Sequence, residues 1–288
     1  MRSLVIHTGG IGDFILSWPA LARLAEHGPV ELMGRRDRLM LAVAAGLAED
    51  AHELEMPDIE WLYGAGEIDN PPLQLVQRLS RFDRCVLWQR DGGGICQRLR
   101  KCGIPDVSAY PGLPPKDWIR HASSYYLERL GLGPVEPLQV DFPTERAPNG
   151  PDLDVVIHPG SGSAAKNWPL ERFCRLAETL EKSGRSVSWC LGPAEDEIAV
   201  PAGAAVLREK ELVTIASRLS SAALYTGNDS GITHLAAAAG CPSIAIFGPT
   251  NPAVWAPLGG HVQVVHNPAW PKVDEVLSLV PGLRYFRD

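Results

Sequence analysis

Residues 153–169 read Leu-Asp-Val-Val-Ile-His-Pro-Gly-Ser-Gly-Ser-Ala-Ala-Lys-Asn-Trp-Pro, an apolar run followed by a loop of glycine, serine and lysine. The run Leu153–Ile157 has the length and composition of a buried strand. Residues Leu170–Lys182 then repeat apolar side chains at helical spacing, and Gly184 follows as a stop signal. A strand, a glycine-rich loop and a helix in this order indicate the first unit of a doubly wound α/β domain. The apolar face of the helix is predicted to comprise Leu170, Phe173, Cys174, Ala177 and Leu180.

The loop of this unit has the composition of an anion site. Gly160 and Gly162 permit close approach of the backbone, and N–H groups in such a loop can point outward. Lys166 adds a positive charge beside a helix N-terminus, with Pro169 predicted in the first helical turn. A diphosphate would suit this arrangement. An ordinary turn with a solvated lysine is equally compatible with the spacing, since no Walker-type pattern is present.

Composition and charge narrow the class of protein. The chain has 288 residues, enough for two domains, with 45% hydrophobic and 21% charged residues, as in soluble globular proteins. A net charge of −7 argues against a nucleic-acid partner. The six cysteines form no C-x-x-C pair, so we expect no metal site and a cytoplasmic location. No signal peptide or membrane span is expected.

Two halves of the chain repeat the same pattern. Residues 1 to about 145 alternate short apolar strands with helical segments, and the segment 143–151 concentrates turn-forming residues. After it the alternation restarts. We therefore predict an α/β protein of two Rossmann-like, doubly wound domains, residues 1–147 and 152–288, that bind ligands between them at the carboxyl ends of their strands.

A second glycine-rich loop, Thr8-Gly-Gly-Ile-Gly-Asp13, follows the first predicted strand and opens a helix predicted over residues 12–27. Ile15 replaces the third glycine of the dinucleotide fingerprint, so a nicotinamide cofactor is poorly supported. The loop does place Asp13 in the first turn of a helix that faces the crevice. Asp13 is either an acid favoured there by the helix dipole alone or a catalytic carboxylate.

The third loop is Tyr225-Thr-Gly-Asn-Asp-Ser-Gly-Ile-Thr-His234. Asp229 or Ser230 can cap the following helix. Ser230 and Gly231 would also offer backbone donors to a ligand in the same crevice, with His234 one turn further in. His234 is otherwise a packed histidine beside an alanine-rich helix.

Two more loops follow strands of the second half. Glu195 lies where an acid can accept hydrogen bonds from ribose hydroxyls, although a solvated first-turn acid fits as well. The segment Phe247-Gly-Pro-Thr-Asn-Pro252, with Trp255, can wall a nucleotide pocket or belong to the core.

Positive charge is concentrated locally in this acidic chain. Residues 78–101 carry seven basic and two acidic side chains, and residues 34–38 carry three arginines and one aspartate. An acidic acceptor or an anionic membrane surface would explain these clusters, although charge runs are usually solvated faces.

Taken together, the motifs resemble glycosyltransferase family 9, the ADP-heptose:lipopolysaccharide heptosyltransferases. The resemblance spans nearly the whole chain in the family's order. The matching pieces are Gly12-Asp13 with Pro19-Ala20-Leu21, His158-Pro-Gly-Ser-Gly with Lys166-Asn-Trp-Pro, Gly227-Asn-Asp-Ser-Gly-x-x-His-Leu-Ala-Ala-Ala, and Phe247-Gly-Pro-Thr with Trp255.

The resemblance implies a GT-B architecture, in which the C-terminal half holds the nucleotide-sugar and the N-terminal half holds the acceptor across a central cleft. It implies that Asp13 is the general base and that Glu195 meets the nucleoside. Ser161, Gly162, Ser163 and Lys166 would hold the diphosphate. The donor site would be lined by Asp229, Ser230, Gly231 and His234.

The expected activity is inverting, metal-independent transfer of a heptose or related sugar from a nucleoside-diphosphate sugar, ADP-heptose by the resemblance. The acceptor would be a lipopolysaccharide core or a similar acidic saccharide or glycolipid, reached by peripheral contact with the inner membrane surface. No cofactor and no nucleic acid are expected. Two alternatives stay open at this level: an epimerase on the same fold, and a binding protein that keeps the diphosphate pocket without catalysis.

Overall fold

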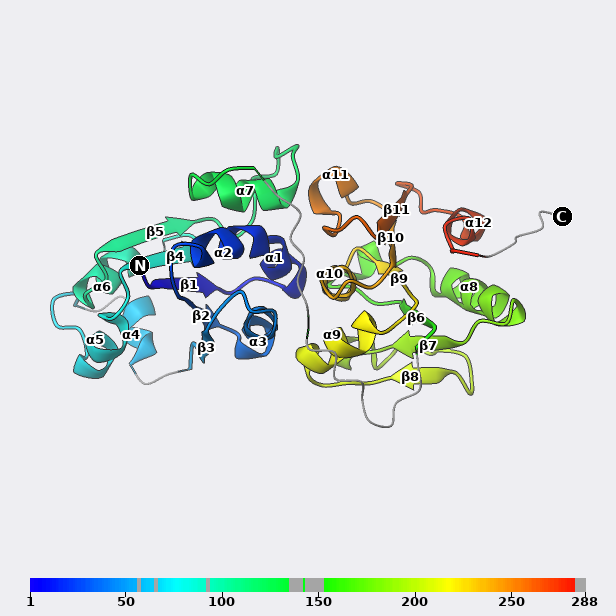
Figure 1. Cartoon of the computed structure of the whole chain (residues 1–288), viewed down its shortest axis with the longest axis horizontal. Coiled ribbons are helices and arrows are strands. Elements are labelled where there is room, and N and C mark those ends of the chain that lie inside the picture. Colours follow the sequence, from blue (N-terminus) through cyan, green and yellow to red (C-terminus); the bar gives the residue numbers. More distant parts are fainter. Residues whose placement is uncertain (56–57, 65–66, 92–93, 135–141, 143–152, 283–288) are drawn as a thin grey trace. The chain divides into compact units, whose positions relative to one another are not determined.

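The chain forms two compact units in the computed structural model, which describes residues 1–55, 58–64, 67–91, 94–134, 142 and 153–282 (Figure 1). One unit comprises Met1–Trp118 with Ala122–Glu136, and the other comprises Ile119–His121 with Pro137–Asp288. The domain boundary predicted between residues 147 and 152 lies outside the described residues. Each unit contains one parallel sheet, which confirms the predicted α/β class.

The N-terminal sheet has the strand order β3-β2-β1-β4-β5. Its strands are β1 (Ser3–His7), β2 (Val30–Gly34), β3 (Asp50–Glu53), β4 (Arg84–Trp88) and β5 (Asp106–Tyr110), and the paired strands are all parallel. The order reverses at β1, whose residues are all buried. Loops that follow β1, β2 and β4 therefore leave from one edge of the sheet, beside the point of reversal.

The helix predicted over residues 12–27 is divided at Ser17 into α1 (Ile11–Leu16) and α2 (Trp18–Ala25). Pro19 lies at the start of α2 and has no N–H to donate to the carbonyl of Ile15. The Ser17 hydroxyl instead donates to Phe14 O at 2.7 Å. The other helices of this unit are α3 (Arg36–Ala44), α4 (Ile59–Tyr63), α5 (Leu73–Leu79), α6 (Ile95–Lys101) and α7 (Ala122–Arg129).

The C-terminal sheet has the order β11-β10-β9-β6-β7-β8 and reverses between β6 and β9. Its strands are β6 (Val155–His158), β7 (Val187–Cys190), β8 (Ala205–Leu207), β9 (Leu224–Asn228), β10 (Ser243–Phe247) and β11 (Val262–His266). The strand β8 was not expected from the sequence. Both central strands, β6 and β9, are fully buried, as the apolar run over residues 153–157 predicts for β6.

The helix α8 (Leu170–Lys182) begins and ends where the sequence predicts. Its buried residues are Phe173, Leu176, Ala177 and Leu180, so Leu176 replaces Leu170 and Cys174, which are only partly buried. Pro169 precedes the helix in extended geometry rather than lying in its first turn. The remaining helical segments are η1 (Ala164–Lys166), η2 (Pro193–Glu195), α9 (Leu212–Ser220), α10 (Gly231–Ala238), α11 (Pro252–Trp255) and α12 (Val273–Leu277).

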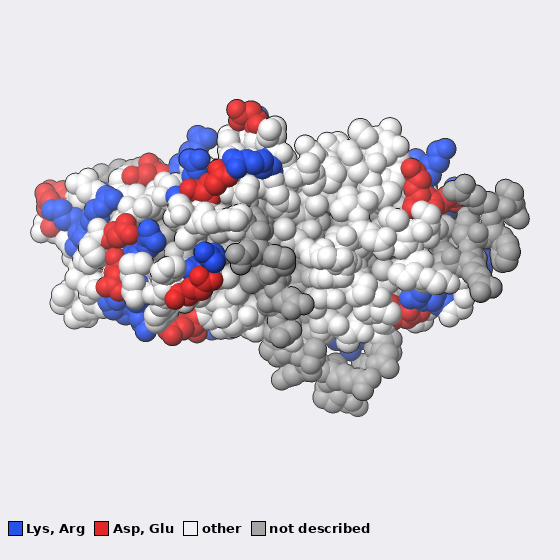
Figure 2. All heavy atoms as spheres, turned by 45° about the horizontal axis from the view of Figure 1, so that its top comes forward, with Lys and Arg blue, Asp and Glu red and all other residues white. Residues whose placement is uncertain are grey.

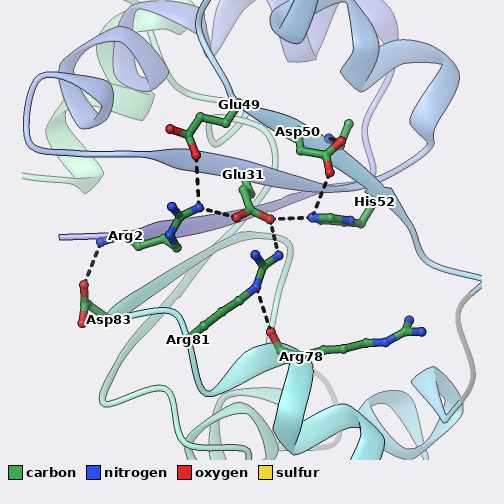
Figure 3. A network of polar contacts seen from close by, with 9 residues as sticks. Arg2, Glu31, Glu49, Asp50, His52, Arg78, Arg81 and Asp83 are labelled. Carbon is green, nitrogen blue, oxygen red and sulfur yellow. Dashed lines mark hydrogen bonds and ion pairs between the residues drawn. The ribbon is translucent and has the colours of Figure 1, made fainter.

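A buried carboxylate organises the amino-terminal edge of the N-terminal sheet (Figure 3). Glu31 of β2 is 3% exposed. Arg2 Nη1 lies 2.6 Å from Glu31 Oε1, and His52 Nε2 lies 2.6 Å from Oε2. Arg81 Nη2 also pairs with Oε2. Residues before β1, within β3 and after α5 are thereby tied to one side chain, on the edge opposite the loop that carries Asp13.

The basic surface predicted over residues 78–101 is largely neutralised by residues distant in sequence. Arg81 pairs with Glu31, Arg84 with Asp106 at 2.9 Å and Lys101 with Asp69 at 2.9 Å. Arg98 is 2% exposed, and it donates to the carbonyl of Glu67. Figure 2 accordingly shows basic and acidic side chains interspersed over the N-terminal unit. Among the described residues, no helix combines the length and apolar composition needed to cross a bilayer.

Candidate functional site

The reversal point of the C-terminal sheet brings two of the predicted loops side by side. His158, the last residue of β6, pairs with Gly227 of β9. A Cβ at Gly227 would lie 2.4 Å from the Tyr225 hydroxyl and 3.1 Å from His158 O, so only glycine permits this approach. The loop of residues 159–169 and the residues Asp229 and Ser230 therefore leave adjacent strands at the position where doubly wound sheets bind ligands.

Asn228 holds the 159–169 loop at both ends, and the sequence reasoning missed it. Its side chain is fully buried at the end of β9. Asn228 Nδ2 donates to Pro159 O at 2.8 Å, and Trp168 N–H donates to Asn228 Oδ1 at 2.8 Å. A primary amide is suited to this role because it both donates and accepts. Its signal in the sequence was a polar residue at the end of an otherwise apolar strand.

Lys166 and Asp229 form an ion pair across the reversal point. Lys166 Nζ lies 2.8 Å from Asp229 Oδ2, with side chains that are 37% and 6% exposed. The predicted diphosphate-binding lysine is thus held next to the start of α10 by a carboxylate. An anion that reaches this position would compete with Asp229 for the ammonium group.

The N-terminus of α10 is capped by Ser230 and not by Asp229. The Ser230 hydroxyl accepts from Thr233 N–H at 3.3 Å, and the Thr233 hydroxyl donates to the carbonyl of Asn228. Gly231 is the first helical residue and is partly exposed. First-turn N–H groups have no intrahelical acceptor, so this end of α10 favours an anion.

His234 lies in the first turn of α10 and is 4% exposed. Its Nδ1 atom has no hydrogen-bond partner among the described residues. Burial lowers the pKa of His234 to about 4, against an opposing effect of Asp229. The imidazole is therefore neutral at physiological pH and can donate or accept a hydrogen bond, but it supplies no positive charge.

The hydroxyl of Ser161 is turned into its own loop. It lies 2.7 Å from Ser163 O and 2.6 Å from Asn167 Oδ1, and it accepts from Ser163 N–H at 3.2 Å. Gly162 and Ser163 are exposed. The loop thus offers exposed backbone at Gly162, while the Ser161 side chain holds the backbone of Ser163.

Glu195 is 6% exposed and packs against the 159–169 loop at Gly160. Its Oε2 accepts from Gly192 N–H at 2.8 Å. A Cβ at Gly160 would lie 2.1 Å from Glu195 Oε1, so the carboxylate rests directly on the Gly160 backbone. His158 beneath it donates through Nδ1 to Cys190 O at 2.9 Å. Burial lowers the pKa of His158, and the Glu195 carboxylate acts in the opposite direction.

The loop after β10 is shaped by Trp270. Trp270 adopts φ = 73°, and a Cβ at Gly248 would lie 2.5 Å from its ring. Arg172 Nη1 and Trp168 Nε1 both donate to Pro271 O at 2.9 Å. Trp168 of the 159–169 loop therefore bonds to Pro271, and the neighbouring Trp270 ring lies against Gly248 of the segment predicted to wall a nucleotide pocket.

Asp13 belongs to the N-terminal unit, in the first turn of α1. Gly10 N–H donates to Asp13 Oδ2 at 3.2 Å. Arg38 Nη1 donates to Gly9 O, in the same loop, at 2.6 Å. Sequence reasoning placed Arg38 only within a charge cluster. Among the described residues, no group of three or more His, Cys, Asp or Glu side chains is arranged to hold a metal ion.

The comparisons with known proteins agree with the predicted family. The family model Glycosyltransferase family 9 (heptosyltransferase) matches residues 140–279. Lipopolysaccharide heptosyltransferase 1 of Pseudomonas aeruginosa is 38% identical over 118 residues, which cover 39% of this chain and 33% of that protein. Lipopolysaccharide heptosyltransferase 3 of Escherichia coli K12 is 30% identical over 116 residues, 37% of this chain and 34% of that protein. These matches span about a third of the curated relatives' length.

Solved structures resemble the chain over more of its length. Escherichia coli ADP-heptose lps heptosyltransferase II has a TM-score of 0.73 at 19% identity, covering 92% of this chain and 90% of that chain. Escherichia coli heptosyltransferase WaaC with ADP has a TM-score of 0.67 at 18% identity, covering 96% and 98%. The predicted fold class, α/β of the GT-B type, is confirmed by these likenesses.

Proposed function

Because residues 140–279 match the family model Glycosyltransferase family 9 (heptosyltransferase), we propose that the chain is an inverting glycosyltransferase that moves a heptose from ADP-heptose to a lipopolysaccharide core saccharide. The observation that carries the proposal is the arrangement at the reversal point of the C-terminal sheet. There Lys166 lies beside the N-terminus of α10, and the loop with exposed Gly162 leaves the adjacent strand.

In the proposed donor complex, the diphosphate takes the place of Asp229 as the partner of Lys166. Ser161 and Gly162 contribute backbone N–H groups, whereas the Ser163 N–H stays bonded to the Ser161 hydroxyl and keeps the loop in shape. The start of α10 contributes its dipole and the N–H of Gly231. Glu195 accepts hydrogen bonds from the ribose hydroxyls. Neutral His234 offers Nδ1 to the ligand without adding charge. Asp229 and Ser230 keep the loop and the helix start in register.

In the proposed reaction, Asp13 accepts the proton of an acceptor hydroxyl while that oxygen attacks the anomeric carbon and inverts it. The bond from the anomeric carbon to the diphosphate oxygen breaks, and negative charge grows on the departing nucleoside diphosphate. Lys166 and the helix N-terminus are oriented in advance to stabilise that charge, so these residues need no metal ion for this step.

Exposed arginines of the N-terminal unit support the proposal of an acidic saccharide acceptor. Arg35 and Arg36 follow β2, and Arg90 follows β4, at the sheet edge from which the Asp13 loop also leaves. These side chains suit an acidic saccharide. A glycolipid acceptor would bring the protein to the cytoplasmic face of the inner membrane by peripheral contact.

Two measurements on the purified chain test the proposal. Calorimetry with ADP, UDP and GDP should show a preference for ADP, with weaker binding in Lys166→Ala. Mass spectrometry should show one heptose added when ADP-heptose is supplied with a heptose-deficient core saccharide. A new sugar product from ADP-heptose alone would indicate an epimerase instead. Tight ADP binding without transfer to any core saccharide would indicate a binding protein.

A further inference from the structure

We propose that Arg38 is a positioning residue for Asp13, because it fixes the orientation of the peptide group that hydrogen-bonds the Asp13 carboxylate. This inference rests on the proposed role of Asp13 as general base. Arg38 does not contact the reacting atoms in this proposal. It acts through the peptide that joins Gly9 to Gly10.

The geometry of that peptide carries the argument. Arg38 Nη1 donates to the carbonyl oxygen of Gly9 at 2.6 Å, and the N–H of Gly10 donates to Asp13 Oδ2 at 3.2 Å. The Gly9 carbonyl and the Gly10 N–H belong to the same planar group. In a trans peptide these two bonds point in opposite directions, so holding the oxygen aims the N–H at Asp13.

Without Arg38, little else would keep this peptide in place. Glycine lies on both sides of it, and glycine pairs allow a peptide plane to rotate with low steric resistance. Larger residues would crowd the loop, because a Cβ at Gly9 would lie 2.8 Å from His7 Cε1, and one at Gly10 would make a tight contact of 3.2 Å with Asp13 Oδ2. The loop therefore needs glycine for space and needs a separate restraint against rotation.

The sheet brings Arg38 to this peptide. Gly34, the last residue of β2, is paired with His7 at the end of β1. A Cβ at Gly34 would lie 2.1 Å from His7 O, so glycine lets the chain leave β2 directly beside the Asp13 loop. The first turn of α3 then directs Arg38 across to Gly9, 29 residues away in sequence.

The charge of Arg38 has a second effect on the same loop. Burial, followed by the charge of Arg38, lowers the pKa of His7 to about 4. His7 is therefore neutral, and its Nδ1 accepts from Gly9 N–H at 3.2 Å. The backbone N–H of Gly9 is thus bound by His7, and its carbonyl oxygen is bound by Arg38. The guanidinium hydrogen bond also polarises the peptide and strengthens the Gly10 N–H as a donor to the Asp13 anion.

The titratable and charged groups near Asp13 determine how its ionisation responds when Arg38 is removed. Tyr126 of α7 lies close enough for the Asp13 charge to raise the pKa of its phenol, after the larger effect of burial. Burial, followed by the charge of Arg35, lowers the pKa of Arg38, whereas Asp37 and Asp13 act in the opposite direction. His7 and Tyr126 are both neutral at physiological pH, and removing Arg38 removes a positive charge that favours ionised Asp13.

The test compares Arg38→Met, Arg38→Lys and the wild-type protein, with Arg23→Met as a control that removes a surface guanidinium from α2. For Arg38→Met we expect kcat to fall about 10- to 100-fold, as for a misplaced catalytic group. The acidic limb of the kcat profile should move to higher pH, with little change in the KM of the acceptor. Arg38→Lys keeps a charge and a donor and should show a smaller change in the same direction.

A second readout does not depend on transfer. In protein with 13C-labelled aspartate, the Asp13 carboxyl resonance is assigned by its absence in Asp13→Asn, and its titration midpoint should move to higher pH in Arg38→Met. An unchanged midpoint and acidic limb in folded Arg38→Met would overturn the proposal, as would an increase confined to the KM of the acceptor. Should Arg38→Met fail to fold, the same criteria apply to Arg38→Lys. If Asp13→Asn keeps full turnover, the base assignment fails, while the resonance still reports on the link between Arg38 and Asp13.

Discussion

The two sheets begin with similar strands, but the loops that follow those strands differ. β1 and β6 are the first strands of their units, each lies at the reversal point, and each ends in a buried histidine, His7 or His158. After β1 the chain enters a helix at Ile11 and presents a carboxylate. After β6 it runs through the 159–169 loop and presents backbone and a lysine. Topology thus fixes where the two loops leave their sheets, and loop length and composition decide whether a carboxylate or a lysine with exposed backbone stands there.

Removing the carboxylate should give the largest effect. We expect Asp13→Asn to lower kcat about 10²- to 10⁴-fold, the range for loss of a general base, while ADP affinity stays the same. Steady-state kinetics and calorimetry measure the two quantities. The matched control is Asp69→Asn, because Asp69 is an exposed aspartate of the same unit. Turnover equal to that of the wild type would show that the short loop does not supply the base.

Removing the lysine should affect binding instead of proton transfer. Lys166→Ala loses a charge-assisted contact and leaves Asp229 as an unpaired carboxylate facing the ligand. We expect ADP to bind about 10- to 100-fold more weakly, since hydrogen bonds to charged groups contribute about 1.5–3 kcal/mol. Lys166→Arg should recover part of the affinity. Lys182→Ala, on the exposed side of α8, is the control. Equal ADP affinities of Lys166→Ala and Lys182→Ala would rule out an anion site at Lys166.

Two glycines of the long loop provide a finer test. Gly160→Ala would push Glu195 away from the loop, because the new Cβ would lie 2.1 Å from Oε1. A Cβ at Gly162 has no neighbour within 4 Å. We expect Gly160→Ala to weaken ADP binding about tenfold, as a modest overpacking cost would, and Gly162→Ala to change it less than twofold. Calorimetry with both variants measures the contrast. If the two variants bind alike, Glu195 does not contribute to nucleotide binding.

Local patterns predicted the elements well. The helix α8 has the predicted bounds, because an apolar period bounded by turn residues is a local signal. The division of the first helix at Ser17 was also signalled locally, by Pro19. The loop of Ser161 and Lys166 and the residues that follow β9 leave neighbouring strands, because all strands of the sheet are parallel and β6 pairs with β9.

Long-range contacts could not be predicted in this way. Asn228 reaches Trp168 across 60 residues, and Arg38 reaches Gly9 across 29. The charge count over residues 78–101 also missed that Arg81 pairs with Glu31, 50 residues away. A charge count over a sequence window contains no information on partners that the fold brings in from elsewhere. Side chains that position a site are therefore harder to predict than side chains within its motifs.

The smallest effect should be a loss of stability at acidic pH, and it involves one buried histidine from each unit, His7 and His234. Burial lowers the pKa of His7 and of His234 to about 4, whereas the unfolded chain takes up these protons near pH 6.5. Unfolding therefore binds protons between pH 6.5 and 4, and stability must fall as the pH falls through that window. Each histidine should lower the free energy of unfolding by about 1 kcal/mol between pH 6.5 and 5.5. Urea titrations at both pH values measure this loss. His234→Asn should reduce it, whereas the exposed control His266→Asn should not. An equal loss in all three proteins would mean that His234 titrates normally in the folded state and is open to water, so that its Nδ1 is not a buried group waiting for a ligand.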